Sequence, residues 1–355
     1  MKRISVIGAG NGGQALAGHL AMLGCEVVLY NRDIIKLRSI HDMGGIHLKG
    51  CINGFGAIKA LTDDLAEAVS FAEIILIVTT ANAHKELAYR MSSFLKEGQI
   101  VLLSPGRTFG ALEFRNCLEE RHFSKRIYVA ETQTLIFACR LERIGIVNII
   151  GIKKNVFFSA YPSVDNLKVY EEISKLYGCF TPVKNILITG LENIGAILHP
   201  AIYLFNAAVI ERGEQFYFYR QMTAHIASFI TQVDNVRLLI GLKLGLNLIS
   251  VEDWITFAYP EIRGNDLCEK IKNNPAYYDI LGPKEVYSRQ LLEDVPMGIL
   301  PLMDLGECLH VDVSLLKALY EMASAFLNMD FRREGRSFQN LKINLSVIEK
   351  INGEK

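Results

Sequence analysis

A glycine-rich segment near the N-terminus has the spacing of a phosphate-binding turn. It follows the apolar run Ile4–Ile7 and reads Gly8-Ala9-Gly10-Asn11-Gly12-Gly13. In a strand–turn–helix unit, Gly8 permits the tight turn, Gly10 lets the backbone approach a pyrophosphate, and Gly13 lets the helix pack closely on the strand. The helix N-terminus offers amide groups and a positive dipole end to the phosphates. We therefore predict that residues 8 to 13 bind a dinucleotide, rather than forming a glycine turn that binds nothing.

The residues after the next predicted strand bear on which nicotinamide dinucleotide is used. An NAD site usually has an acid there, which accepts hydrogen bonds from the ribose hydroxyls. This chain has Asn31, Arg32 and Asp33 instead. Arg32 could pair with a 2′-phosphate through its bidentate donors. Alternatively, Arg32 is a solvated charge and Asp33 is a displaced acid. We expect NADP to be preferred over NAD, and Thr79 and Thr80, which end another strand, to line the cofactor site.

Alternating strand and helix patterns in the first 150 residues would position this turn. Apolar runs without alternation, such as Ile74–Val78, suit parallel strands that are covered on both faces. A helix stripe of Leu16, Leu20 and Leu23, ended by Gly24, follows the turn. The strand candidates are Ile4–Ile7, Glu26–Tyr30, Ile74–Val78, Ile100–Leu103, Arg126–Val129 and Ile146–Ile150. The pattern predicts an N-terminal doubly wound α/β (Rossmann) domain.

The pattern changes in the second half of the chain. Long helical periodicities replace the strand runs, as in Met222–Leu246 and Val313–Asn328. We place the boundary near residue 185, which gives a dinucleotide-binding domain over 1–185 and an all-α substrate domain over 186–355. No internal repeat or low-complexity segment interrupts either part.

Composition excludes several classes of partner. The 38 basic residues balance the 38 acidic ones and no run of like charge is present, so neither a nucleic-acid groove nor an anionic membrane surface is expected. The seven scattered cysteines form no CxxC pair, which disfavours a disulfide framework or a metal site and fits a reducing cytosol. No uninterrupted apolar stretch reaches about 18 residues, so no transmembrane helix is expected. We expect a cytoplasmic protein whose partners are small molecules, and a homodimer is plausible.

Seven segments together resemble the octopine/nopaline (opine) dehydrogenase family. Besides the glycine turn they are Thr79-Thr80-Ala81-Asn82-Ala83-His84, Ser104-Pro105-Gly106-Arg107-Thr108, Ala130-Glu131-Thr132-Gln133-Thr134-Leu135, Leu198-His199-Pro200, Asn274-Pro275-Ala276-Tyr277 and Glu293-Asp294-Val295-Pro296-Met297-Gly298. They occur in the family's order over nearly the whole chain. The resemblance implies a Rossmann domain, an α-helical domain and an active site in the cleft between them.

The resemblance also implies a reaction. That family joins the amino group of an amino acid to the carbonyl of a 2-oxo acid, and hydride from NADH or NADPH reduces the imine to a secondary-amine dicarboxylate. A histidine acts as general acid and base and an aspartate holds it; the matching residues are His199 and Asp294. An arginine for a substrate carboxylate is expected shortly before the aspartate, where Arg289 stands. No particular amino acid is implied.

Each of these residues also has a structural interpretation. His199 lies in an apolar stretch, and its pattern alone favours a buried core histidine; the resemblance and its titration near neutral pH favour catalysis. Asp294 could be a turn or cap carboxylate instead of the acceptor that fixes the tautomer of His199. Arg289 and Arg107 could be solvated or loop-stabilising charges. We keep both arginines, and Asn193, as candidate substrate-binding residues.

Two other functions remain open. A different two-domain reductase, of the ketopantoate reductase or glycerol-3-phosphate dehydrogenase type, resembles the first third of the chain but relies on a catalytic lysine. Lys243 is the main candidate, in a helix where a snorkelling role is favoured. A cofactor-sensing protein without activity is the second alternative, and the presence of both His199 and Asp294 counts against it.

Overall fold

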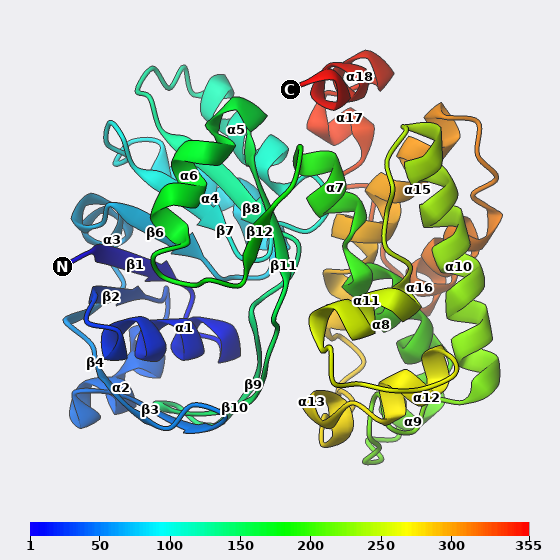
Figure 1. The fold of residues 1–355 in the computed structure, drawn as a ribbon, viewed down its shortest axis with the longest axis horizontal. Helices are drawn as coiled ribbons and strands as arrows, with labels where there is room; N and C mark the ends of the chain where they lie inside the picture. Colours follow the sequence, from blue (N-terminus) through cyan, green and yellow to red (C-terminus); the bar gives the residue numbers. More distant parts are fainter. Residues whose placement is uncertain (355) are drawn as a thin grey trace. The chain divides into compact units, whose positions relative to one another are not determined.

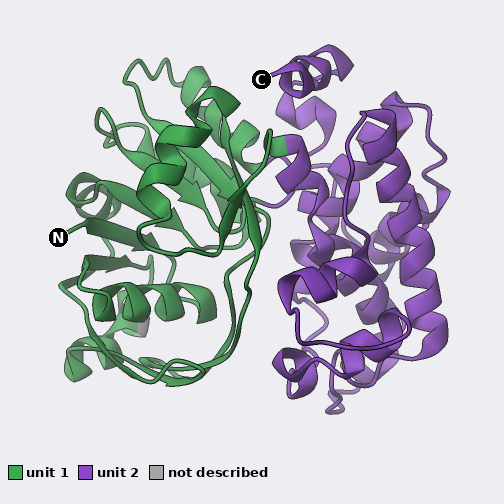
Figure 2. Ribbon diagram, viewed as in Figure 1, with its two compact units in different colours: residues 1–106, 110–186, 355 green, residues 107–109, 187–354 purple. Residues whose placement is uncertain are grey.

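The computed structural model describes residues 1–354, which divide into two compact units (Figures 1 and 2). Unit 1 contains residues 1–106 and 110–186, and unit 2 contains residues 107–109 and 187–354. Residues 107–109 thus belong to unit 2 although their neighbours in sequence belong to unit 1. Each unit is described here by itself.

An eight-stranded sheet forms the centre of unit 1. Its strands are β1 (Arg3–Ile7), β2 (Glu26–Tyr30), β5 (Ala60–Thr62), β6 (Ile74–Ile77), β7 (Ile100–Leu103), β8 (Tyr128–Thr132), β11 (Val156–Tyr161) and β12 (Phe180–Pro182). They are ordered β12-β11-β8-β7-β6-β1-β2-β5, and only the β8–β11 pair is antiparallel. From β5 to β8 this is the strand order of a doubly wound dinucleotide fold, whose switch point lies between β1 and β6. The predicted fold class is confirmed.

A second, four-stranded sheet was not anticipated from the sequence. It contains β3 (Gly45–Gly50), β4 (Gly54–Ala57), β9 (Phe137–Arg143) and β10 (Ile146–Ile152), in the order β4-β3-β10-β9. The predicted strand at Ile146–Ile150 therefore does not belong to the main sheet. Buried and partly buried residues alternate along β10, as they do when one face of a strand is covered. Helix α1 (Asn11–Met22) contacts both sheets, and a Cβ on Gly56 of β4 would lie 2.0 Å from the Gly18 carbonyl oxygen of α1.

Most of the remaining helices of unit 1 lie along the main sheet and connect its strands, whereas the helix over Arg38–Met43 contacts β3 of the second sheet (Figure 1). Two sequence predictions need correction. The strand expected at Arg126–Val129 begins two residues later, at Tyr128, and the Arg126 side chain pairs with Asp165. Leu23 is 52% exposed and lies beyond the apolar stripe of α1. The helices are α2 (Arg38–Met43), α3 (Leu65–Phe71), α4 (His84–Met91), α5 (Gly110–Glu120) and α6 (Asn166–Ile173), with 3-10 turns η1 (Ile34–Leu37), η2 (Ala81–Ala83) and η3 (Ser163–Asp165).

Unit 2 is helical throughout the part that the structure describes, apart from one isolated bridge between Tyr217 and Leu281. The two long helical patterns in the sequence are confirmed as α10 (Ala224–Lys243) and α16 (Ser314–Leu327). The others are α7 (Ile186–Leu191), α8 (Ile194–Leu204), α9 (Ala207–Glu211), α11 (Val251–Ala258), α12 (Leu267–Lys272), α13 (Pro275–Tyr278), α14 (Arg289–Leu292), the π-helix η4 (Val295–Ile299), α15 (Leu300–Cys308), α17 (Phe338–Leu341) and α18 (Leu345–Gly353).

One helical stretch, Ile186–Leu204, is long and apolar enough to cross a membrane by length and composition alone. It comprises α7 and α8, and 89% of its most apolar window is buried within the protein. Burial of that kind is typical of a core helix in a globular domain. All seven cysteines are unpaired.

Candidate active site

The glycine turn after β1 has the geometry that its sequence predicts. Gly8 has a φ of +108°, a region that side chains rarely adopt. A Cβ on Gly13 would lie 1.7 Å from the Gly8 carbonyl oxygen, so α1 can pack on the turn only with glycine there. A Cβ on Gly10 would meet no protein atom within 4 Å, and a Cβ on Gly12 would press on Leu135 at 2.7 Å. The N-terminus of α1 has no side-chain cap, so its amide groups suit a pyrophosphate.

Two other residues of the turn have structural contacts. Ala9 is buried, and its carbonyl oxygen accepts a hydrogen bond of 2.7 Å from Gln14. The Asn11 side-chain oxygen accepts from the Leu141 amide at 2.9 Å, which ties the start of α1 to β9. Their proposed contacts with a cofactor stay predictions.

Thr79 provides a second indication that the site holds a ligand. It follows β6 at the switch point, and its hydroxyl is buried without a hydrogen-bond partner among the described residues. Its methyl carbon would lie 2.9 Å from a Cβ on Gly8, so the threonine packs on the glycine turn. Thr80 is exposed at the start of η2. An orphaned hydroxyl beside an uncapped helix N-terminus fits a dinucleotide.

The end of β2 presents an arginine. Arg32 is exposed, and its side chain forms no ion pair with other residues in the described chain. Asp33 accepts from the Ile35 amide at 3.1 Å and caps η1, so one of its carboxylate oxygens has a structural use. Asn31 donates to the Asp33 carbonyl oxygen at 3.0 Å. This arrangement favours Arg32 over Asp33 as the residue that would meet the adenosine ribose.

His199 and Asp294 are brought together in unit 2. His199 lies on α8 and is 8% exposed, and Asp294 lies directly before η4 and is fully buried. His199 Nδ1 and Asp294 Oδ2 are 2.7 Å apart. Helix α8 and the π-helix η4 approach closely because a glycine of η4 faces a small residue of α8. A Cβ on Gly298 would lie 2.4 Å from the Cβ of Ala196. A π-helix such as η4 often marks a functional position.

The charges around this pair determine its protonation. Burial alone would raise the pKa of Asp294, but the charges of Arg107 and His199 and the hydrogen bond from His199 outweigh burial and lower that pKa to about 2. Burial lowers the pKa of His199, and Arg289 and Arg107 act in the same direction against the attraction of Asp294. At neutral pH a carboxylate therefore faces a neutral imidazole. Because a carboxylate only accepts, the proton of the imidazole lies on Nδ1 and Nε2 has the lone pair.

Arg107 has the densest set of contacts at the site. It donates to both carboxylate oxygens of Glu293, at 3.3 and 3.2 Å, and to Asn193 Oδ1 at 3.3 Å. Its Nη1 is 3.6 Å from Asp294 Oδ1, and a Cβ on Gly195 would lie 2.8 Å from the same nitrogen. Burial would lower the pKa of Arg107, but the two carboxylates raise it. Its guanidinium is thus bound to acidic and amide groups of the protein itself.

Arg289 differs in exposure. Its side chain is 44% exposed, and its Nη1 is 3.6 Å from Glu293 Oε2. Asn193, by contrast, is buried and donates to the Thr108 hydroxyl at 3.4 Å. Of the predicted substrate-binding residues, Arg289 is therefore the one with a guanidinium open to solvent. The roles of all three stay predictions.

Two further residues contact the cluster of His199, Asp294 and Arg107 and were not among the candidates predicted from the sequence. Glu293, which binds Arg107, adjoins Asp294 and lies in the same sequence motif. Tyr219, in the loop before α10, has its hydroxyl 2.8 Å from His199 Nε2. The aromatic run Phe216-Tyr217-Phe218-Tyr219 between two helices was the available signal. Lys243, the candidate of the alternative reductases, is exposed in the last turn of α10.

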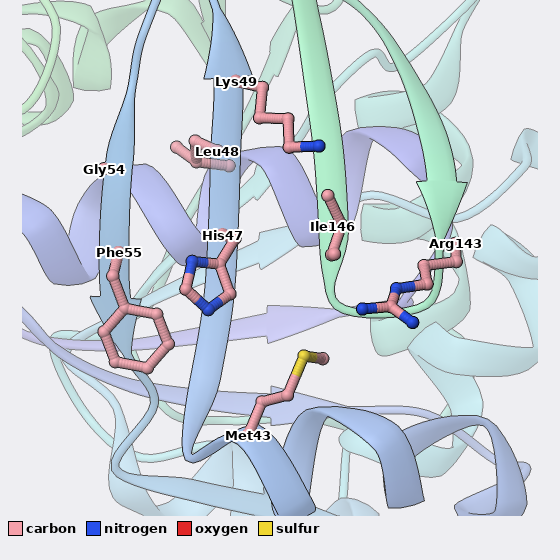
Figure 3. Close-up of a pocket in the computed structure, with 8 residues that line it drawn as sticks. All are labelled: Met43, His47, Leu48, Lys49, Gly54, Phe55, Arg143 and Ile146. Carbon is pink, nitrogen blue, oxygen red and sulfur yellow. The ribbon is translucent and has the colours of Figure 1, made fainter.

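A surface pocket of about 650 Å³ lies on the second sheet of unit 1 and contains none of the predicted site residues (Figure 3). Its lining residues are Met43, His47, Leu48, Lys49, Gly54, Phe55, Arg143 and Ile146. The aromatic rings of His47 and Phe55 are in contact there, and Lys49 pairs with Glu142. The pocket shares no lining residue with the glycine turn or with the cluster around His199.

Two family models match the chain. Residues 182–327 match the α-helical domain of NAD/NADP octopine/nopaline dehydrogenase. Residues 3–108 match the N-terminus of NAD-dependent glycerol-3-phosphate dehydrogenase, which accounts for the likeness to that enzyme in the first third.

Individual proteins agree with these models. An opine dehydrogenase from Arthrobacter sp. is 35% identical over 342 residues, covering 96% of this chain and 95% of that protein. A solved octopine dehydrogenase with NADH and L-arginine aligns with a TM-score of 0.79 at 20% identity, covering 100% and 99% of the two chains. A yersinopine dehydrogenase with NADP⁺ bound aligns at 0.76 and 14% identity, covering 100% and 99%. This chain therefore belongs to the opine dehydrogenase family of NAD(P)-dependent oxidoreductases, which act on CH–NH groups.

Proposed function

We propose that this enzyme condenses the amino group of an amino acid with a pyruvate-like 2-oxo acid, with His199 as the proton carrier. The observation that carries the proposal is the buried pair of His199 and Asp294, 2.7 Å apart, in which the acid is ionised and the imidazole is neutral. A neutral histidine has a basic lone pair on Nε2, which can accept a proton that comes from a substrate ammonium group. The same ring can later return that proton.

The proton steps follow from that role. The imidazole takes a proton from the amino acid, and the amine nitrogen then attacks the carbonyl carbon of the 2-oxo acid. The carbinolamine hydroxyl receives the proton back and leaves as water, which gives an iminium ion. The nicotinamide cofactor, when bound, supplies the hydride that reduces this iminium carbon. Asp294 fixes the ring tautomer and stabilises the imidazolium that forms transiently.

The arginines take different parts in this proposal. Arg107 keeps Asp294 ionised, because its positive charge lowers the pKa of that buried carboxyl. Arg289 binds a substrate carboxylate, because its guanidinium is exposed beside the cluster. Asn193 orients Arg107 through its side-chain oxygen.

NADPH is the proposed cofactor, held by residues 8 to 13, Thr79 and Thr80. Arg32, at the end of β2, would attract the 2′-phosphate. Arg32→Ala should therefore weaken NADPH binding by roughly 1–3 kcal/mol and leave NADH nearly unchanged. Fluorescence titration with both cofactors checks this, and an equal loss for both would remove Arg32 from the site.

We also propose that the enzyme acts in the cytoplasm, which the unpaired cysteines support, and forms a homodimer.

Substrate-dependent oxidation of the cofactor tests the main proposal. Purified protein with NADPH and pyruvate alone should turn over slowly, because reduction of a ketone to an alcohol is not the proposed reaction. Addition of the correct amino acid, found from a panel of the common ones, should start rapid oxidation of NADPH. Mass spectrometry should then detect the secondary amine. Efficient reduction of ketopantoate without any amine would refute the proposal and favour a ketone reductase.

A further inference from the structure

Tyr219 occupies the nitrogen of His199 on which the proposed chemistry depends. Its hydroxyl lies 2.8 Å from Nε2, while Asp294 holds Nδ1. Since the neutral ring has its proton on Nδ1, Nε2 has one in-plane lone pair and Tyr219 donates to it. A substrate proton cannot bond directly to Nε2 while this hydrogen bond persists. Either the phenol transmits the proton or it must leave.

The packing of Tyr219 opposes its departure. The residue is 7% exposed, and its ring stacks on Tyr277 with centroids 4.4 Å apart and planes at 22°. The ring of Phe218 meets it edge-on at 5.0 Å. The loop is fixed on both sides, because the Phe218 amide donates to the Ile280 carbonyl at 2.8 Å and the Met222 amide donates to the Tyr219 carbonyl at 3.0 Å. Rotation of the phenol away from His199 would break the ring contacts with Tyr277 and Phe218, and the backbone bonds keep the loop from moving with it.

We propose that Tyr219 relays protons between the substrate and His199. A phenol has one donor and two acceptor lone pairs, so it can accept one proton while donating another. In the forward direction the substrate ammonium passes a proton to the Tyr219 oxygen as the phenolic proton moves to His199 Nε2. When the carbinolamine hydroxyl leaves as water, both protons return in the reverse order. Tyr219 has no net charge before or after either step. This inference rests on the proposed role of His199.

Tyr219→Phe tests the relay directly. It should lower kcat about 100-fold, within the range for acid–base catalysis, with NADPH affinity and Tm close to wild type. Tyr217→Phe is the matched control, since it removes a hydroxyl from the same loop and should leave kcat unchanged. The acid limb of the pH–rate profile should also move to higher pH in Tyr219→Phe, because the phenol stabilises the neutral imidazole.

A double mutant and a proton inventory distinguish the relay from its alternatives. The His199→Ala/Tyr219→Phe enzyme should be little slower than His199→Ala, and multiplied losses would overturn the relay. Full or increased activity of Tyr219→Phe would show that the substrate displaces the phenol. For the wild-type enzyme, a plot of rate against the fraction of D2O should be curved, because two protons move in the same step. A linear plot would refute the relay, and this test does not depend on whether the variant folds. Wild-type activity of His199→Ala would instead refute the proposed function itself.

Discussion

Unit 2 contains two buried clusters of one arginine and two acids, and they differ in how fully they are hydrogen-bonded. In the first, Arg107 faces Glu293 and Asp294. In the second, Arg237 donates to Asp234 at 2.7 Å and to Glu192 at 3.3 Å, and further to the carbonyl oxygens of Leu191 and Ile249. The second cluster joins the end of α7, the middle of α10 and the start of α11.

The second cluster has a donor for every acidic oxygen. The free oxygens of Asp234 and Glu192 accept from the backbone amides of Val251 and Ile249. In the first cluster, Asp294 Oδ1 has no hydrogen bond among the described residues and lies 3.6 Å from Arg107. A fully bonded network stabilises one arrangement of its side chains. In the first cluster, the charge of Asp294 can instead stabilise His199 when the imidazole gains a proton. The bonding of the second cluster fits an architectural role, and that of the first fits the chemistry that we propose for His199.

The largest effect should come from Asp294→Asn. The amide cannot stabilise an imidazolium or fix the Nδ1 proton, so kcat should fall roughly 10²–10⁴-fold. The free energy of unfolding should change less than for the same substitution in the second cluster, because Asp294 Oδ1 loses no hydrogen bond. Steady-state kinetics and urea denaturation measure both quantities. A lower free energy of unfolding with an unchanged kcat would indicate that the first cluster is structural, like the second, and would contradict the comparison.

Asp234→Asn is the matched change in the second cluster. Both oxygens of Asp234 accept from donors, so one donor would face an amide NH2 and Arg237 would lose a buried countercharge. We expect about 3–5 kcal/mol of lost stability in urea denaturation. The kcat of the folded fraction should stay at the wild-type value. A normal stability with reduced kcat would reverse the assignment of the two clusters.

Glu192 gives the second cluster a pH dependence. Burial raises its pKa to about 7, from 4.5, against the attraction of Arg237. The folded chain thus binds this proton more tightly than the unfolded chain, and the free energy of unfolding should fall by up to about 3 kcal/mol as pH rises from 4.5 to 7. Glu192→Gln should flatten that slope in urea denaturation at pH 5 and pH 8. The exposed Glu214→Gln is the control, and an unchanged slope in Glu192→Gln would refute the assignment.

The smallest expected effect concerns Arg289, at the edge of the first cluster. Arg289→Gln should raise KM for one carboxylate substrate roughly 10–100-fold, corresponding to about 1–3 kcal/mol. The free energy of unfolding should change by less than about 1 kcal/mol, because the side chain is half-exposed. Arg212→Gln, in an exposed pair with Glu214, should change neither quantity. An unaltered KM in Arg289→Gln would show that another residue binds the substrate carboxylate.

The sequence by itself determined the local features of this protein. Gly8, Gly10 and Gly13 specify the turn after β1, because backbone geometry and close approach depend on neighbours a few residues apart. Apolar runs such as Ile74–Ile77 predict buried parallel strands, and the periodicities of α10 and α16 predict a helical unit. His199 and Asp294 were found only because the motif order resembles a family.

Only the tertiary structure decided which distant residues meet. Arg107 follows a strand of unit 1 in sequence, yet it pairs with Glu293, 186 residues later, within unit 2. Tyr219 reaches His199 through a loop whose position depends on contacts with residues near 280. The second sheet likewise unites β3 and β10, whose pairing leaves no local signal. Periodicity reports which face of an element is buried, but it does not report which element covers that face, and the candidate site is built from such long-range contacts.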